Sequence, residues 1–175
     1  MSSIAYEPTL LEMRGGKWRD YMRMAIWEDV EQAARTLTKE SREELRLLPE
    51  FKTWSVLDIL HWGYTASTIC VVLGAFGSKN VFGIGGVVSF DRKGSIWLLL
   101  CNGWEKDRRT VRMMTREARS FLKDLHTVLG EMNTDTFENY VSSNSEKQIR
   151  WLQWLGAEFT TECGDSTPGL LHFKI

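Results

Sequence analysis

Three short apolar runs in the middle of the chain constrain its fold more than any other feature. They are STICVVLGAF (67–76), NVFGIGGVVSF (80–90) and SIWLLLCN (95–102), all rich in β-branched and aromatic residues. The polar segments between them, GSKN and DRKG, are as short as hairpin turns. The pattern therefore predicts three consecutive antiparallel strands.

The residues after the third run make the predicted sheet mixed. TREARSFLKDLHTVLGEM (115–132) places apolar residues on one helical face, and TFENYV (136–141) follows as a strand. A strand, a helix and a second strand in this order form a right-handed crossover between parallel strands. We predict an α/β fold of the α+β type, with a mixed central sheet that is antiparallel in its N-terminal part and is flanked by helices.

The glycines at 83–86, in the sequence GIGG, resemble a phosphate-binding loop in composition only. Such a loop precedes a helix, whereas this one lies inside a strand-like run. A β-bulge is the prediction for this segment.

The N-terminal third is charged and helical in pattern. KWRDYMRMAIWEDVEQAART (17–36) predicts one amphipathic helix whose inward positions are spaced by three and four: Trp18, Tyr21, Met22, Ala25, Ile26 and Val30. Thr38 and Ser41 are candidate N-caps of a second, short helix that Pro49 ends. TWSVLDIL (53–60) is a candidate third helix.

NYVSSNSEKQIRWLQWLGAEF (139–159) predicts a strand, a capped helix and a further strand. Asn144 or Ser145 offers a cap, and Gly156 offers the left-handed conformation that closes a helix. The inward stripe is formed by Ile149, Leu152 and Leu155. Two tryptophans flank that stripe and either cover the sheet or anchor a partner, because tryptophan is common at binding hot spots: Trp151 and Trp154.

Size, charge and composition exclude several classes of protein. The 175 residues, 43% of them hydrophobic, suit one domain over residues 1–175. With a net charge of −1 the chain has no global positive field for nucleic acid, although a local basic patch is compatible with that charge. We expect no membrane insertion, because no apolar run approaches the roughly 18 residues that span a bilayer. The scattered cysteines and histidines predict neither a metal site nor a disulfide framework.

The order of these elements resembles the GNAT (GCN5-related N-acetyltransferase) superfamily. More narrowly, FGIGGVVSFDRKGSIWLL, the long helix and residues 139–159 resemble the internal virion protein A family of T7-like podoviruses. The resemblance spans residues 13–159. It implies a role inside the virion or in its morphogenesis, in the virion or the infected-host cytoplasm. The implied partners are other phage virion proteins or further copies of the chain.

An active GNAT enzyme holds acetyl-CoA along the strand before the long helix and at the glycine-rich turn that follows it. The resemblance makes Trp97, Leu98 and Leu99 candidate coenzyme contacts, with Asn144 near the next helix. The turn, however, has no glycine between Trp104 and Leu129, so bulky side chains replace the bare amides that seat a diphosphate. Three arginines either supply charge there or belong to a solvated loop: Arg108, Arg109 and Arg112. Under the coenzyme alternative, Arg108 and Arg109 lie near the pyrophosphate.

The catalytic residues that the resemblance implies are missing. The tyrosine expected four residues before the helix-closing glycine is Leu152, and no known motif gives that role to Tyr140. The first two strands contain no carboxylate to act as a base. Solvated or structural roles are predicted for the remaining titratable candidates, and we assign no catalytic residue: Asp91, His61, His126 and Cys101.

The preferred hypothesis is a catalytically degenerate acetyltransferase fold that needs no cofactor. The alternative is an active acetyl-CoA-dependent N-acyltransferase, host-modifying or counter-defence in role. Nucleic-acid binding is a weaker third hypothesis, because the basic residues spread around a helix start and Asp107 and Glu117 dilute them. The basic residues concerned are Arg108, Arg109, Arg112, Arg116 and Arg119.

Overall fold

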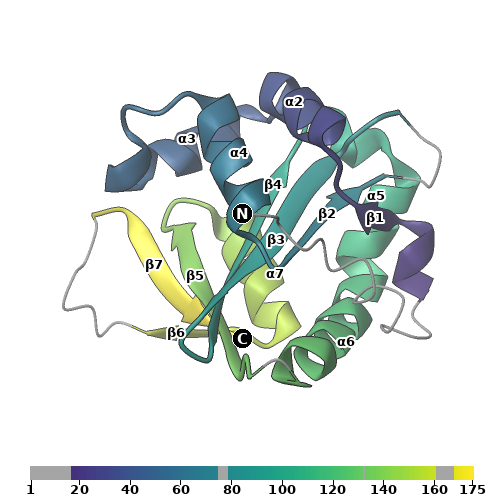
Figure 1. Ribbon diagram of the computed structural model, residues 1–175, viewed down its shortest axis with the longest axis vertical. Helices are drawn as coiled ribbons and strands as arrows, with labels where there is room; N and C mark the ends of the chain where they lie inside the picture. Colours follow the sequence, from purple (N-terminus) through teal and green to yellow (C-terminus); the bar gives the residue numbers. More distant parts are fainter. Residues whose placement is uncertain (1–16, 75–78, 132, 161–167) are drawn as a thin grey trace.

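A seven-stranded sheet forms the centre of the molecule (Figure 1). The computed structural model describes residues 17–74, 79–131, 133–160 and 168–175. Within them the strand order is β1-β2-β3-β4-β5-β7-β6, and every neighbouring pair is antiparallel except β4 and β5. This confirms the predicted mixed sheet. The bounds are β1 (Met22–Met24), β2 (Ile69–Leu73), β3 (Gly83–Phe90), β4 (Lys93–Leu100), β5 (Thr136–Ser142), β6 (Glu158–Thr160) and β7 (Leu170–Lys174).

Helices cover both faces of the sheet. On one face pack α2 (Trp27–Thr36), α3 (Lys39–Leu47) and α4 (Val56–Ala66); on the other lie α5 (Arg108–Arg112), α6 (Ala118–Glu131) and α7 (Glu146–Leu155) (Figure 1). The alternation of β2 shows how this works: Ile69, Val71 and Leu73 face α6, whereas Cys70 and Val72 face α2 and α4.

The predicted helix over residues 17–36 is wrong in its first half. A 3₁₀ turn, η1 (Lys17–Asp20), and strand β1 precede α2, and Met22 pairs with Leu73 of β2. The spacing of three and four residues gave a wrong prediction because buried residues of η1, β1 and α2 fall at helical intervals along the sequence. Ile26, which that pattern placed inside, is 51% exposed at the N-cap of α2.

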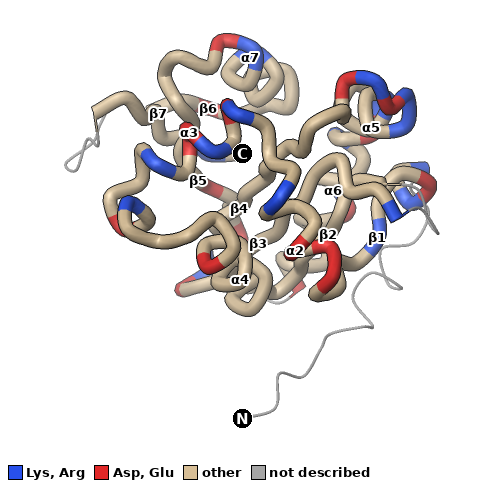
Figure 2. Tube along the Cα trace, turned by 90° about the horizontal axis from the view of Figure 1, so that it is seen from above, with Lys and Arg blue, Asp and Glu red and all other residues tan. Residues whose placement is uncertain are grey.

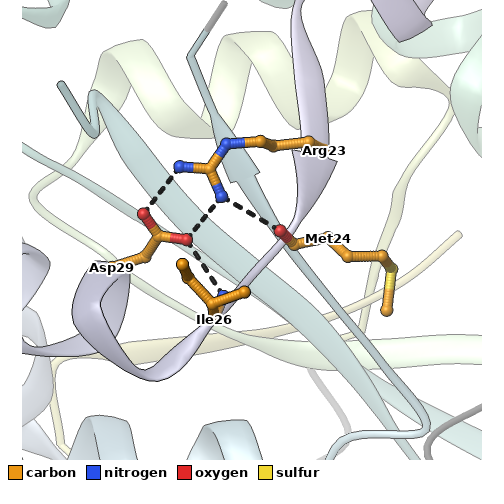
Figure 3. Close-up of polar contacts among 4 residues, drawn as sticks. All are labelled: Arg23, Met24, Ile26 and Asp29. Carbon is orange, nitrogen blue, oxygen red and sulfur yellow. Dashed lines mark hydrogen bonds and ion pairs between the residues drawn. The ribbon is translucent and has the colours of Figure 1, made fainter. Parts of the chain in front are cut away.

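A buried ion pair fixes the turn between β1 and α2 (Figure 3). Two guanidinium nitrogens of Arg23 donate to the Asp29 carboxylate at 2.6 and 2.7 Å, and Arg23 also donates to the Met24 carbonyl at 3.1 Å. The same carboxylate accepts the Ile26 backbone N–H at 3.0 Å, which caps the first turn of α2. The chain therefore leaves the strand and enters the helix at a set angle.

The other helix ends agree with the sequence more closely. Thr38 caps α3 by accepting the backbone N–H of Ser41 at 3.1 Å, as predicted, and Pro49 opens a separate 3₁₀ turn, η2 (Pro49–Phe51). The third helix, α4, begins after Ser55. Gly156 closes α7 with φ +107°, also as predicted. Ser145 holds the N-cap position of α7 but its side chain makes no capping bond, so that predicted cap is wrong.

The long helix is longer and less regular than its pattern indicates. It begins at α5 and passes through a single π-helical turn, η4 (Met113–Glu117), into α6. The predicted bulge at 83–86 is also wrong, because β3 pairs residue by residue with both β2 and β4. Strand β7 was not predicted at all; it enters the sheet between β5 and β6.

Candidate functional site

Strands β4 and β5 diverge after a short parallel contact. They pair only where residues 93–95 face residues 136–138, and Asn139 marks the start of the divergence by donating its side-chain N–H to the Ile96 carbonyl at 2.5 Å. The splay that a GNAT enzyme uses to admit the pantetheine arm of its coenzyme is therefore present in the backbone.

An apolar cavity of about 380 Å³ follows the divergence. The candidate contacts Trp97, Leu98 and Leu99 all line it, together with Met114 from the long helix and Trp151 from α7. The other three candidates, Arg108, Arg109 and Asn144, are exposed and do not line it. The structure thus brings together the strand residues of the predicted site but not its charged and polar ones.

The free edge of β4 is largely taken up by the protein itself. The Leu100 N–H donates to the Ser41 hydroxyl at 3.0 Å, and the Leu100 carbonyl accepts the Thr38 N–H at 2.9 Å. Backbone N–H and C=O groups of every second residue in a strand point to the same edge. The backbone groups of Leu98 therefore face the same edge as those of Ile96 and Leu100. Of the three residues on this edge, Leu98 is the one without a partner among the described residues.

Asp107 occupies the start of the long helix. Gly103, with φ +88°, turns the chain out of β4, and a 3₁₀ turn, η3 (Trp104–Lys106), leads to Asp107. The Asp107 carboxylate accepts the Thr110 backbone N–H at 2.8 Å. A negative charge of the chain itself thus lies at the helix N-terminus, where a diphosphate would need the same amides. Asp107 counted in the sequence only as a diluting charge, although aspartate is a favoured N-cap.

Glu44 of α3 is a cavity residue that sequence reasoning missed. Its carboxylate accepts the Ser142 backbone N–H at 3.4 Å and the Gln148 side-chain N–H at 3.3 Å. Burial raises the pKa of Glu44 above its ordinary value, more than these two bonds lower it. The Gln148 Oε1 atom beside it is buried without a partner. The signal was present in the sequence, since Ser41, Leu45 and Leu48 form the inward stripe of α3 and Glu44 lies beside that stripe.

We expect Glu44→Gln to raise the melting temperature relative to the parent protein more at pH 7 than at pH 4. Below the ordinary carboxyl pKa of about 4.3, Glu44 is neutral in both the folded and the unfolded chain. As the pH rises, the unfolded chain ionises first, so the parent protein loses stability that the amide variant keeps. Melting curves at the two pH values measure the difference.

Glu43→Gln is the control, because the Glu43 side chain is 66% exposed on the same helix. The exposed ion pair of Glu43 with Lys39, at 3.6 Å, contributes little to stability, so the melting difference of this variant should change little between the two pH values. A Glu44→Gln difference that does not change with pH, or that favours the variant at pH 4, would contradict a buried, destabilised carboxylate.

The two tryptophans of α7 differ in their surroundings. Trp151 packs against two hydrophobic clusters, one that contains the buried residues of α6 and one formed by Val141, Leu152 and Phe173. Its indole N–H donates to the Met114 carbonyl at 2.6 Å. These contacts support the covering role for Trp151. Trp154 is 36% exposed and lies under the Arg119 guanidinium, whose central carbon is 4.4 Å from the ring centroid. Its role as a partner anchor stays a prediction.

The remaining catalytic candidates have structural surroundings. Leu152 is buried against Val141 of β5 and Phe173 of β7, and Tyr140 is exposed beside the His172 ring. His126 packs on Phe137 with centroids 4.2 Å apart, and burial lowers its pKa. Burial raises the pKa of the Cys101 thiol, which disfavours the nucleophilic thiolate. Cys163 lies outside the described residues.

Neither a membrane-spanning helix nor a cluster of metal ligands is present among the described residues. None of the described helices is long and apolar enough to cross a bilayer. The described residues also contain no group of three or more histidine, cysteine, aspartate or glutamate side chains placed to hold a metal ion.

Comparison with solved structures identifies the fold. No protein-family model and no curated protein matches the chain. The GNAT domain of PAT from S. lividans is similar with a TM-score of 0.62 and 14% identity, over 88% of each chain. Spermidine N-acetyltransferase from Vibrio cholerae in complex with CoA and spermine gives 0.57 and 12%, over 88% of this chain and 93% of that one. A Bacillus subtilis acetyltransferase in complex with CoA gives 0.51 and 12%, over 89% and 97%. The mixed seven-stranded sheet with helices on both faces is therefore the GNAT acetyltransferase fold.

Proposed function

We propose that this protein uses the acetyltransferase fold as a scaffold for assembly and has lost the binding of acyl-CoA. The observation that carries the proposal is the Asp107 carboxylate on the Thr110 amide at the start of the long helix. A diphosphate placed there would meet a like charge instead of free N–H donors, and the turn offers no second set of glycine amides.

The strand edge supports the same conclusion. A pantetheine arm binds by pairing its amides with free backbone groups, yet Thr38, Ser41 and Asn139 already bond to Leu100 and Ile96. Leu98 alone is left to pair with a ligand on this edge, among the residues that the structure describes. The residues present therefore do not fit the coenzyme.

The assembly role itself comes from the resemblance to the phage internal virion proteins, and an exposed apolar surface supports it. Helix α4 has a single charged residue, Asp58, and turns Leu57 and Trp62 outward at 38% and 46% exposure. The Trp27 ring of α2 lies against the His61 ring of α4, with ring centroids 4.8 Å apart. Exposed apolar surfaces of this kind are typical of protein interfaces. Mass spectrometry of purified phage particles tests the role, and absence of the chain from the particles would contradict a virion component.

We expect coenzyme A and acetyl-CoA at 1 mM to leave the melting temperature unchanged. A ligand at a hundred times its dissociation constant adds about 2.7 kcal/mol of stability, which for a domain of this size is a shift of about 5 to 10 °C. Scanning fluorimetry detects a shift of that size. A clear rise for the parent protein would overturn the loss of coenzyme binding.

Asp107→Ser is the matched variant for this measurement. Serine keeps a side-chain cap for Thr110 while removing the charge, so the helix start should remain intact. A shift that appears in Asp107→Ser but not in the parent protein would identify the carboxylate as the group that excludes the diphosphate.

A second candidate function is an active acetyl-CoA-dependent N-acyltransferase with a host-modifying or counter-defence role. The apolar cavity along the diverging strands and the buried Glu44 carboxylate favour it. Its test is release of free CoA from acetyl-CoA in the presence of amine acceptors. Release that Glu44→Gln abolishes would support this candidate against the scaffold.

A further inference from the structure

We propose that the outward face of the long helix binds the phosphate backbone of duplex DNA without regard to sequence. Five cationic side chains lie on this face, called here the basic stripe: Arg108, Arg112, Arg116, Arg119 and Lys123. The inference goes beyond the scaffold role and does not depend on whether acyl-CoA binds.

The helix places the five cations in one line. Their intervals of four, four, three and four residues are those of one helical face, and all five side chains are exposed. The opposite face is buried in the core, at Met114, Ala118, Leu122, Leu125 and Leu129. Figure 2 shows basic residues over α5 with acidic residues among them. In the sequence Arg108, Arg109, Arg112, Arg116 and Arg119 were expected to spread around a helix start. The structure aligns four of them with Lys123 along more than three turns, and Arg109 lies off this line.

The acidic residues that were expected to dilute the stripe lie off it. The Asp107 carboxylate is turned to the Thr110 N–H. Glu117 is half-buried. It lies in line with Met113 and Phe121, four residues away on either side, and this line is away from the outward face. Asp124 is half-buried and accepts the Trp18 indole N–H at 2.8 Å.

The charges of the stripe are available to a ligand. Among the described residues, no carboxylate lies within 4.0 Å of any of the five cationic groups. Arg119 is held in place by Trp154, whose ring it covers and whose carbonyl accepts its guanidinium N–H at 2.8 Å. Five like charges kept side by side without counter-ions from the protein indicate a polyanionic partner.

The geometry and chemistry of the stripe match phosphates. From residue 108 to residue 123 the helix rises about 22 Å at about 1.5 Å per residue, the length of about six phosphates along one strand of duplex DNA. Four of the five cations are arginine, which recognises phosphate through paired N–H groups. Three further exposed positions of the helix carry hydroxyl residues, Thr115, Ser120 and Thr127, and the exposed acidic Glu131 lies beyond the stripe at the end of α6. The Thr115 and Thr127 hydroxyls donate to the carbonyls of Val111 and Lys123, so the Ser120 hydroxyl is the one left to donate to phosphate. A helix that lies in a membrane surface, by contrast, needs an apolar face that is free.

The test is fluorescence anisotropy with a labelled 24-base-pair duplex of mixed sequence in 50 to 200 mM NaCl. Five phosphate contacts predict a slope of log Kd against log salt of about 4.5, so binding should weaken about 500-fold over this range. No binding at 50 mM, or binding without salt dependence, would overturn the proposal.

The stripe variant is Arg108→Gln/Arg116→Gln/Lys123→Gln, since none of these three side chains bonds to another described residue. Two remaining contacts should lower the slope to about 1.8 and the loss to about 12-fold. The control, Arg35→Gln/Lys52→Gln/Lys79→Gln, removes the same charge from exposed positions elsewhere and should behave like the parent protein. Equal loss in both triple variants would mean that net charge alone acts, and would contradict a stripe site.

Two competitors separate DNA from the other polyanions. Poly-glutamate and phosphatidylserine vesicles are added to the preformed DNA complex at matched charge concentration. DNA should be displaced by unlabelled duplex at lower concentrations than by either competitor. Stronger displacement by poly-glutamate would assign the stripe to an acidic protein, and stronger displacement by vesicles would assign it to a membrane surface; either result overturns the proposal.

Discussion

Gly85→Ala is expected to destabilise the protein by about 3 kcal/mol or more, although it adds a single methyl group. A Cβ atom at this position of β3 would lie 2.5 Å from the Trp97 carbonyl oxygen and 3.2 Å from the Leu98 Cα atom. Both are backbone atoms of β4, which pairs with β3 on that side, and β2 pairs with β3 on the other. No rotamer change relieves the contact, so the strands must separate. Overpacking of a rigid site costs about 1 to 3 kcal/mol and sometimes more.

Thermal unfolding measures the effect, which should lower the melting temperature by about 6 to 12 °C for a domain of this size. Gly130→Ala is the matched control, since a Cβ there meets nothing within 4 Å and the residue lies in the last turn of α6. Alanine is favoured over glycine in helices by up to about 1 kcal/mol, so the control should be neutral or slightly stabilising. A Gly85→Ala variant that melts with the parent protein would mean that the strands are less closely spaced than described.

The glycines of GIGG show why a sequence motif does not by itself reveal its structural cause. GIGG was assigned to a bulge, because glycine inside a strand often marks one. Glycine inside a strand also occurs where a neighbouring backbone approaches closely, and this is what the structure shows. A Cβ atom on Gly86 would lie 2.6 Å from the Ile69 carbonyl oxygen. Composition does not distinguish the two causes, because the distance depends on a strand from elsewhere in the chain.

The elements that were predicted correctly are those whose signals are local. The strands β2, β3 and β4, the helix α7 and its closing Gly156 each rest on a pattern contained within about ten residues. Strand β1 has three residues and pairs with β2, and strand β7 has five residues and pairs with β5. These segments are strands because of that pairing with distant residues, which no local pattern reveals. The helix pattern at 17–36 failed for this reason.

The candidate site divides in the same way. Trp97, Leu98 and Leu99 line the cavity because β4 leads into the divergence, a position that follows from the third run. Strand alternation places Leu98 on the α6 face and Trp97 and Leu99 on the opposite face. Asp107 and Glu44 owe their roles to what lies opposite them, a helix amide and the α7 side chain Gln148. A charged residue in a charged segment is expected to be solvated, and only tertiary packing reveals that one of them is buried. The basic stripe is the converse case, since its alignment depends on the helix beginning at α5, earlier than its apolar pattern indicates.

Asp29→Ala is expected to destabilise the protein by about 3 kcal/mol, chiefly because it leaves Arg23 without its partner. Asp29 is 4% exposed and accepts three hydrogen bonds, two from the Arg23 guanidinium and one from the Ile26 N–H. Breaking a buried ion pair costs about 3 to 5 kcal/mol, and the lost helix cap contributes about 1 kcal/mol of its own. The 21% exposure of the Arg23 side chain lets water reach the guanidinium, which places the total at the lower end. Urea unfolding measures the change.

A double-mutant cycle separates the ion pair from the cap. Arg23→Leu alone leaves the less exposed Asp29 carboxylate with only the Ile26 N–H, and Asp29→Leu alone leaves the Arg23 guanidinium without its carboxylate. Arg23→Leu/Asp29→Leu removes both charges together. Since an apolar pair of similar volume often replaces a buried ion pair without loss, the double variant should be more stable than the sum of the two single changes predicts, by about 2 kcal/mol. In the Arg23→Leu background, Asp29→Asn keeps an acceptor for the Ile26 amide, so its difference from Asp29→Ala in that background reports the cap without the guanidinium. Strict additivity of the two single changes would show that the Arg23 and Asp29 side chains in Figure 3 contribute to the turn independently, and the junction between β1 and α2 would then owe its geometry to strand pairing with β2.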